Sequence, residues 1–173
     1  RFSRLRRVVR NPLFLAVREA TTLPLIAAGG IGTGEAIFAL MALGAEGVQM
    51  GTRFALTDES SASDIFKEYC LRLNEGDTKL LLKKLAPTRL VTNSFRDRVE
   101  AAEGRGASAE ELRELLGRGR AKKGIFEGDL EEGELEIGQV AALFRRRQSV
   151  DEVMKELLEG YRRASDKIRS AGL

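Results

Sequence analysis

Two glycine-bearing turns in the first third of the sequence carry residue types that hold phosphate. The first turn, Gly29-Gly30-Ile31, follows a short apolar run that begins at Leu23. The second turn, Gln49-Met50-Gly51-Thr52, follows another apolar run that ends at Val48. Glycine lets backbone N–H groups approach an anionic oxygen closely, and a threonine hydroxyl adds a further donor. The pair of turns therefore predicts a phosphate cradle.

The segment between the two turns has the pattern of an amphipathic helix. Thr33 is a suitable N-cap, apolar residues then recur at helical spacing, and Gly44 ends the pattern. A strand-helix-strand unit with parallel strands puts both turns at the carboxyl ends of the strands, on one edge of a sheet. The alternative for Gly29 and Gly30 is a tight strand-to-helix turn that holds no ligand.

The residues around these turns, AAGGIGTG followed by ALGAEGVQMGTRF, resemble the FMN-dependent nitronate monooxygenase (2-nitropropane dioxygenase) and enoyl-acyl-carrier-protein reductase II superfamily. The resemblance continues through Gly76-Asp77-Thr78, Thr92-Asn93-Ser94-Phe95 and GIFEGDLEEGELEIGQVAAL. It implies FMN as the cofactor, held by Gly29, Gly30, Ile31, Gln49, Met50, Gly51 and Thr52, with Gln139 near the flavin ring. The alternative for Gln139 is a solvated start of a helix.

The resemblance also implies an oxidoreductase, with two alternative substrates. Enoyl reductases pass hydride from NAD(P)H through FMN to an enoyl thioester on acyl carrier protein, and the run GRGRAKKGIFEGDLEEGELEIGQ favours this alternative. Nitronate monooxygenases oxidise alkyl nitronates with oxygen. Both activities depend on a histidine near the flavin, and this sequence has none, so the catalytic base is expected outside this chain. A phosphate-binding barrel without flavin and an inactive fragment are further alternatives.

The predicted fold class is α/β, as the carboxyl-terminal part of a (β/α)8 TIM barrel. A complete barrel needs about 250 residues, and this chain has 173. We predict the last β/α units of the barrel over residues 1–78 and a small, mainly helical lobe over residues 79–130. Residues 131–173 are predicted to form a return segment and a terminal helix that packs on the barrel. The expected partners are the missing amino-terminal part of the protein and a second copy of the chain in a homodimer.

Local signals place several helix boundaries. Ser63 can cap one helix, and Ser108 with Glu111 and Ser149 with Glu152 have the spacing of capping boxes. Asp77-Thr78 has the composition of a turn that ends a helix. The helix after Ser149 carries an apolar stripe that is expected to pack on the barrel, formed by Val153, Met154, Leu157, Leu158 and Tyr161.

Composition excludes several other classes of protein. The net charge is +3 and aromatic residues make up 6% of the chain with no Trp, which argues against a nucleic-acid-binding surface. No apolar run approaches the ~20 residues of a membrane span. The single cysteine, Cys70, fits a cytoplasmic location, and it lies on the apolar face of its predicted helix, where we expect it to be part of the core. We expect no metal site, because four glutamates that alternate along a flexible loop, Glu131, Glu132, Glu134 and Glu136, are expected to be solvated.

Overall fold

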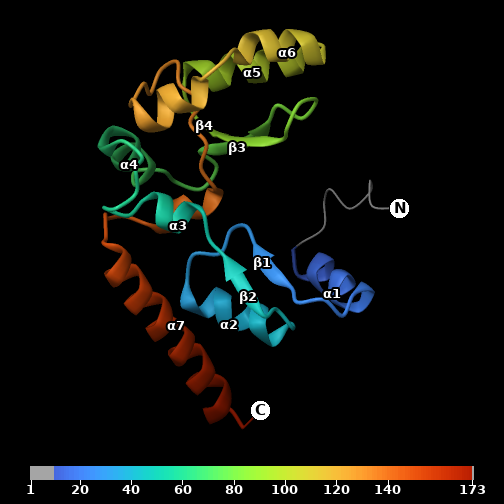
Figure 1. Ribbon diagram of the computed structural model, residues 1–173, viewed down its shortest axis with the longest axis vertical. Helices are drawn as coiled ribbons and strands as arrows, with labels where there is room; N and C mark the ends of the chain where they lie inside the picture. Colours follow the sequence, from blue (N-terminus) through green and yellow to red (C-terminus); the bar gives the residue numbers. More distant parts are fainter. Residues whose placement is uncertain (1–9, 173) are drawn as a thin grey trace. The chain divides into compact units, whose positions relative to one another are not determined.

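The computed structural model describes residues 10–172. Figure 1 shows the elements in chain order. They are α1 (Arg10–Ala20), β1 (Ile26–Ala28), α2 (Gly34–Ala42), β2 (Gly47–Gln49), α3 (Thr52–Ala55), α4 (Asp64–Cys70), β3 (Thr78–Leu81), β4 (Thr88–Val91), α5 (Ser94–Gly104), α6 (Ala109–Leu116), η2 (Lys122–Phe126), η3 (Gln139–Leu143) and α7 (Val150–Ser170).

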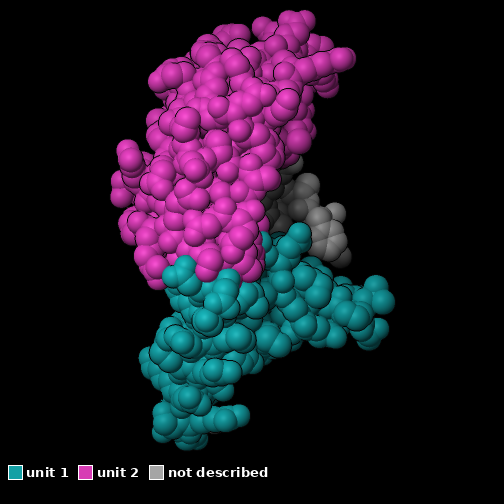
Figure 2. All heavy atoms as spheres, turned by 60° about the vertical axis from the view of Figure 1, so that its left-hand side comes forward, with its two compact units in different colours: residues 1–50, 151–173 teal, residues 51–150 magenta. Residues whose placement is uncertain are grey.

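The chain forms two compact units, which Figure 2 shows in different colours. The first unit contains residues 1–50 and 151–173, and the second contains residues 51–150. The three-part division at residues 78 and 130 stays a prediction. Among the described helices, none is long and apolar enough to cross a lipid bilayer.

The first unit is built on the predicted strand-helix-strand motif. Strands β1 and β2 are parallel neighbours, with Ile26 opposite Gly47 and Ala28 opposite Gln49. Helix α2 connects them, and the Thr33 hydroxyl caps it by accepting a hydrogen bond of 3.2 Å from the Ala36 amide. Both strands therefore end at the same edge of the sheet, as the sequence predicts.

Helix α7 packs against α2 within this unit. Val153 and Leu157 are buried, and the rings of Phe38 and Tyr161 meet edge to face with centroids 5.5 Å apart. The predicted apolar stripe of α7 is only partly buried, because Met154 is 43% exposed and Leu158 is 51% exposed. These two side chains follow the buried ones by one position along the helix and so lie on its neighbouring face.

The second unit contains an antiparallel hairpin where the sequence pattern favours helix. β3 pairs with β4, with Thr78 opposite Val91 and Leu81 opposite Thr88. Thr78 therefore starts a strand, and the prediction that Asp77-Thr78 only ends a helix is wrong. The mixed leucines and lysines between residues 79 and 90 are consistent with a sheet that has one buried face, since Leu81 and Leu90 are 2% and 1% exposed.

Helices α4, α5 and α6 cover the rest of this unit. Ser63 caps α4 as predicted, and the capping box of Ser108 and Glu111 at the start of α6 is complete. Cys70 is fully buried in the core at the end of α4, which confirms its predicted interior position.

Candidate functional site

The first predicted turn follows β1 directly. Gly29 and Gly30 have φ angles of +89° and +64°, a backbone conformation that residues with a side chain rarely adopt. Both glycines are exposed, whereas the Ile31 side chain is 5% exposed and packs with Ala27 and Ala45. The turn is thus anchored by Ile31 and presents its two glycines to the surface.

The second predicted turn follows β2 at the same edge of the sheet. Gln49 is the last residue of β2 and is exposed, and Met50 is half-buried against the core of the first unit. The parallel pairing of Ala28 with Gln49 brings the starts of the two turns together. A hollow of about 560 Å³ lies beside β1, lined by α1, β1, α2 and the glycines of the first turn.

Gly51 and Thr52 belong to the second unit, where Thr52 meets the predicted Gly138-Gln139 turn. The Gly138 amide donates a hydrogen bond of 3.0 Å to the Thr52 hydroxyl oxygen. A Cβ on Gly138 would lie 2.6 Å from that oxygen, so glycine is needed for the close approach. The structure therefore brings together two sequence-predicted segments that are 86 residues apart. Gln139 follows as the exposed first residue of η3.

A buried arginine of α3 contacts the residues that follow η3. Arg53 is 5% exposed and donates a hydrogen bond of 2.9 Å to the side-chain oxygen of Gln148. Its guanidinium also lies 4.3 Å from the centre of the Phe144 ring, a favourable cation–π distance. Arg53 thus ties α3 to the segment that follows η3 and supports the contact between Thr52 and Gly138.

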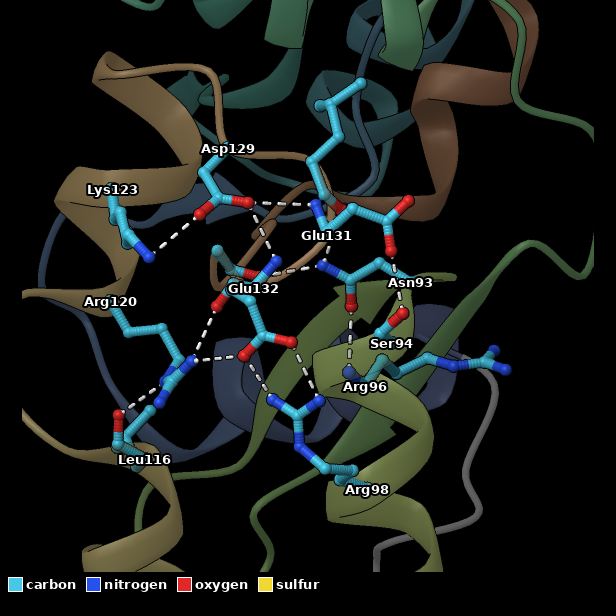
Figure 3. Close-up of polar contacts among 12 residues, drawn as sticks. Asn93, Ser94, Arg96, Arg98, Leu116, Arg120, Lys123, Asp129, Glu131 and Glu132 are labelled. Atoms are coloured by element: carbon cyan, nitrogen blue, oxygen red, sulfur yellow. Dashed lines mark hydrogen bonds and ion pairs between the residues drawn. The ribbon is translucent and has the colours of Figure 1, made fainter.

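The acidic segment before this turn is anchored rather than flexible (Figure 3). The Asp129 carboxylate accepts hydrogen bonds from the amides of Glu131 and Glu132 and pairs with Lys123 at 2.9 Å. The Glu132 carboxylate accepts a hydrogen bond of 2.9 Å from Arg98. Of the four glutamates that are expected to be solvated, Glu131 and Glu136 are exposed and Glu132 is half-buried. The expectation is wrong for Glu134, which is 7% exposed.

Asn93 is a residue whose role the sequence does not reveal. Its side-chain oxygen accepts a hydrogen bond from the Arg96 amide and caps α5. Its side-chain nitrogen donates to the carbonyl oxygens of Leu130 and Gly133 at 3.0 and 2.8 Å. The Asn-Ser pair before an apolar position is a local cap signal, but the two carbonyl partners are nearly forty residues away in the sequence. This part of the Thr92-Asn93-Ser94-Phe95 motif is therefore structural.

Two ionisable groups in the second unit have strongly shifted pKa values. Burial raises the pKa of the Cys70 thiol to about 12, so this thiol is not a nucleophile at neutral pH. Burial also raises the pKa of Glu134 to about 7, and the negative charge of Glu136 adds to the shift. Within residues 10–172, no three acidic or cysteine side chains form a group that could hold a metal ion.

Comparison with known proteins identifies relatives of this arrangement. A family model described as nitronate monooxygenase matches residues 10–160. A probable nitronate monooxygenase of Staphylococcus aureus strain JH9 is 39% identical over 89 residues, which are 50% of this chain and 24% of that protein.

Two solved structures are similar over nearly the whole chain. FabK from Thermotoga maritima has a TM-score of 0.86 and 32% identity, over 95% of this chain and 52% of its own. A nitroalkane oxidase from Streptomyces ansochromogenes has a TM-score of 0.74 and 29% identity, over 91% of this chain and 45% of its own. The chain thus spans about half the length of these solved relatives, and the 89 residues matched to the curated relative cover about a quarter of it.

Proposed function

We propose that this chain, which belongs to the nitronate monooxygenase family, is the FMN-binding part of an oxidoreductase. The observation that carries the proposal is the parallel pairing of β1 and β2, because it puts the two glycine turns at one edge of the sheet. Backbone at positive φ in Gly29 and Gly30 presents amides in a way that suits a phosphate. FMN, when bound, would supply the redox chemistry.

The residues present fit the phosphate end of such a cofactor. A Cβ on Gly51 would meet no atom within 4 Å, so the backbone of this turn is open to close approach. The Thr52 hydroxyl accepts its hydrogen bond from Gly138 and keeps its own proton for donation to a phosphate oxygen. Gln139, in the next position, would donate its amide to a polar atom of the flavin ring or of the substrate.

We also propose that the first unit completes its sheet with further strands of a longer, barrel-forming protein. β1 pairs with β2 on one side only among the described strands, and Ile26 in β1 is 58% exposed. The hollow beside β1 is lined mainly by apolar side chains of α1, β1 and α2. An apolar strand of this kind is normally covered on both faces in a parallel sheet. The half-length match to the solved relatives supports this proposal.

Of the two substrate classes, we favour an enoyl thioester that is carried by acyl carrier protein and reduced with NAD(P)H. The sequence likeness of the region before Gln139 and the close match to FabK, an enoyl-acyl-carrier-protein reductase II, support this choice. The family model and the nitroalkane oxidase support the alternative, oxidation of alkyl nitronates. In both cases we place the histidine base in the rest of the protein, since this chain has none. The single cysteine supports a cytoplasmic location.

Two experiments test the proposal. Titration of FMN against the protein, followed by flavin fluorescence, should show saturable binding that the Thr52→Ala variant weakens. A protein without saturable binding would instead support a phosphate-binding barrel or an inactive fragment. The flavin-loaded longer protein is then assayed with NADH and crotonyl thioester, and separately with propionate 3-nitronate and oxygen. Turnover of the nitronate alone would overturn the preference for the enoyl reductase.

A further inference from the structure

Helix α7 (Figure 1) carries an exposed apolar stripe beside the face that packs on α2. Met154, Leu158 and Ile168 are 43%, 51% and 42% exposed. At 3.6 residues per turn they share one side of the helix with Tyr161 and Ser165, which are half-buried. The buried residues that face α2, Leu157 and Gly160, lie a quarter of a turn or more away from Leu158 around the helix. The stripe therefore extends the apolar surface of α7 beyond its contact with α2.

The charges of α7 are separated along the helix. Residues 151–159 contain four acidic residues and one lysine, whereas residues 160–170 contain four basic residues and one aspartate. The dipole of a single helix favours this order, so the separation alone does not indicate a partner. The positions of the individual charges beside the stripe are more specific.

Two copies of α7 match each other when they pair antiparallel about a two-fold axis at Tyr161. In this register Met154 faces Ile168 of the second copy. Leu158 likewise faces Ser165 of the second copy. Each contact forms twice, because a two-fold interface uses the same surface of both chains. The stripe is then covered by its own counterpart over most of its length.

The same register sets opposite charges against each other beside the stripe. The pairs between the two copies are Asp151 with Arg169, Lys155 with Asp166, and Glu159 with Arg162. Arg162 also approaches its own copy near the axis, and the two Glu159 carboxylates offset that repulsion. A parallel pairing would instead set each charge beside its own copy. The sequence of α7 therefore favours the antiparallel direction.

The charges beside the stripe are available for such pairs. Among residues 10–172, no ion pair is formed by Arg162, Asp166 or Arg169. Lys155 pairs with Asp151 at 2.6 Å, but the two side chains are 69% and 72% exposed. An exposed pair of this kind contributes little to stability, so its members can be shared with a second copy.

We propose that α7 is a self-association surface, on which a second copy of this chain packs its own α7 antiparallel across a two-fold axis at Tyr161. Burial of the two stripes supplies the apolar contact. The flanking charges set the direction and the register of the pair. The proposal goes beyond the proposed function and does not depend on the cofactor.

Disulfide trapping tests the direction and the register together. In a double variant with Met154→Cys and Ile168→Cys, the two new thiols of one chain are about 21 Å apart along the helix, too far for a disulfide within the chain. Mild oxidation should therefore link two chains into a closed dimer, seen on non-reducing gels. Each single variant is a matched control and should stay unlinked, because identical positions lie about 21 Å apart in the antiparallel pair. Cys70 is fully buried and leaves the background low.

Charge reversal tests the ion pairs without a new thiol. Sedimentation velocity over a range of protein concentrations should show a dimer of the wild-type chain. Lys155→Glu faces Asp166 of the second copy with a like charge, twice per dimer, and should weaken association at least about tenfold. Adding Asp166→Lys to the same chain restores opposite charges and should return the dissociation constant to the wild-type value. Lys167→Glu, an exposed reversal away from the stripe, is the control and should leave the constant within about twofold.

A monomeric wild-type chain, or a dimer that the double cysteine variant does not trap, would overturn the proposal. Equal linking of a single variant would also overturn it, because it indicates a parallel pair or unspecific aggregation. If far-UV circular dichroism shows that the double variant is unfolded, rescue of Lys155→Glu by Asp166→Lys decides. In the longer protein, slow labelling of both new thiols in a monomer would show that other barrel elements cover the stripe, which likewise refutes a second copy as its partner.

Discussion

Replacing Gly34 by alanine should separate α7 from α2. Gly34 is the first residue of α2 and is buried under α7. A Cβ at this position would lie 2.7 Å from the Gly160 carbonyl carbon, and it would lie still closer to the Leu157 carbonyl oxygen and the Tyr161 amide nitrogen. All three atoms belong to the backbone of α7, so no side-chain rotation can make room and the helix must move.

The cost of this movement follows from what α7 buries. Leu157 is 3% exposed beside Gly34, and the Tyr161 ring meets the Phe38 ring of α2 edge to face, so these side chains lose apolar contacts if the helices separate. Uncovering an apolar side chain of this size costs about 1.5–3 kcal/mol. We therefore expect Gly34→Ala to lower the free energy of unfolding by at least about 3 kcal/mol, a large share of the ~5–15 kcal/mol that stabilises a typical domain.

Urea unfolding followed by far-UV circular dichroism measures the free energy of unfolding, and tryptic cleavage at Arg162 reports the release of α7. Two glycine variants serve as controls. In Gly160→Ala the three atoms nearest to the new Cβ all belong to the end of the Glu35 side chain, the first of them 2.8 Å away, and this side chain can rotate. In Gly104→Ala, at the end of α5, the Cβ meets nothing within 4 Å. Both controls should stay within about 1 kcal/mol of the wild type. If Gly34→Ala is as stable as they are, the argument from close backbone contact is refuted.

Three further outcomes are expected. Gly30→Val should weaken FMN binding at least tenfold, about 1.4 kcal/mol, because φ at Gly30 is +64°; unchanged flavin occupancy would contradict the cradle. Asn93→Ala should lower the free energy of unfolding by about 2–4 kcal/mol in urea melts, because it removes the cap of α5 and leaves the Leu130 and Gly133 carbonyl oxygens without their donor; a loss below 1 kcal/mol would show that water replaces the amide. Cys70, with a pKa raised to about 12, should resist iodoacetamide at pH 8 until urea is added; rapid labelling of the folded protein would show that the thiol is accessible.

The sequence predicts those parts of the fold that depend on neighbouring residues. Thr33, Ser63 and Ser108 each cap the predicted helix, because a hydroxyl three positions before a free amide is a local geometry. The positive φ of Gly44 likewise ends α2 where the pattern predicts. The parallel order of β1 and β2 follows from the length of the helical connection between them.

The β3–β4 hairpin is not predictable in this way. The leucines and lysines of residues 79–84 suit either a helix or a strand. Contacts outside the segment decide which of the two forms. Val91 donates to Leu135, which is 44 positions away, and the buried side of the hairpin packs on Phe95 and Val99 of α5. Tertiary burial of one face therefore decides the secondary structure here, against a mixed local propensity.

The candidate site shows the same division between local and distant causes. Glycines and a threonine at the ends of two strands are visible as a phosphate motif, since the chemistry needs only those residue types. The need for glycine at positions 34 and 138 is not visible, because it comes from the backbone of α7 in one case and from the Thr52 hydroxyl in the other. The burial of Glu134 is hidden for a related reason. In the sequence it is one of several glutamates in an acidic run, and only the fold leaves it 7% exposed while Glu131 and Glu136 stay exposed.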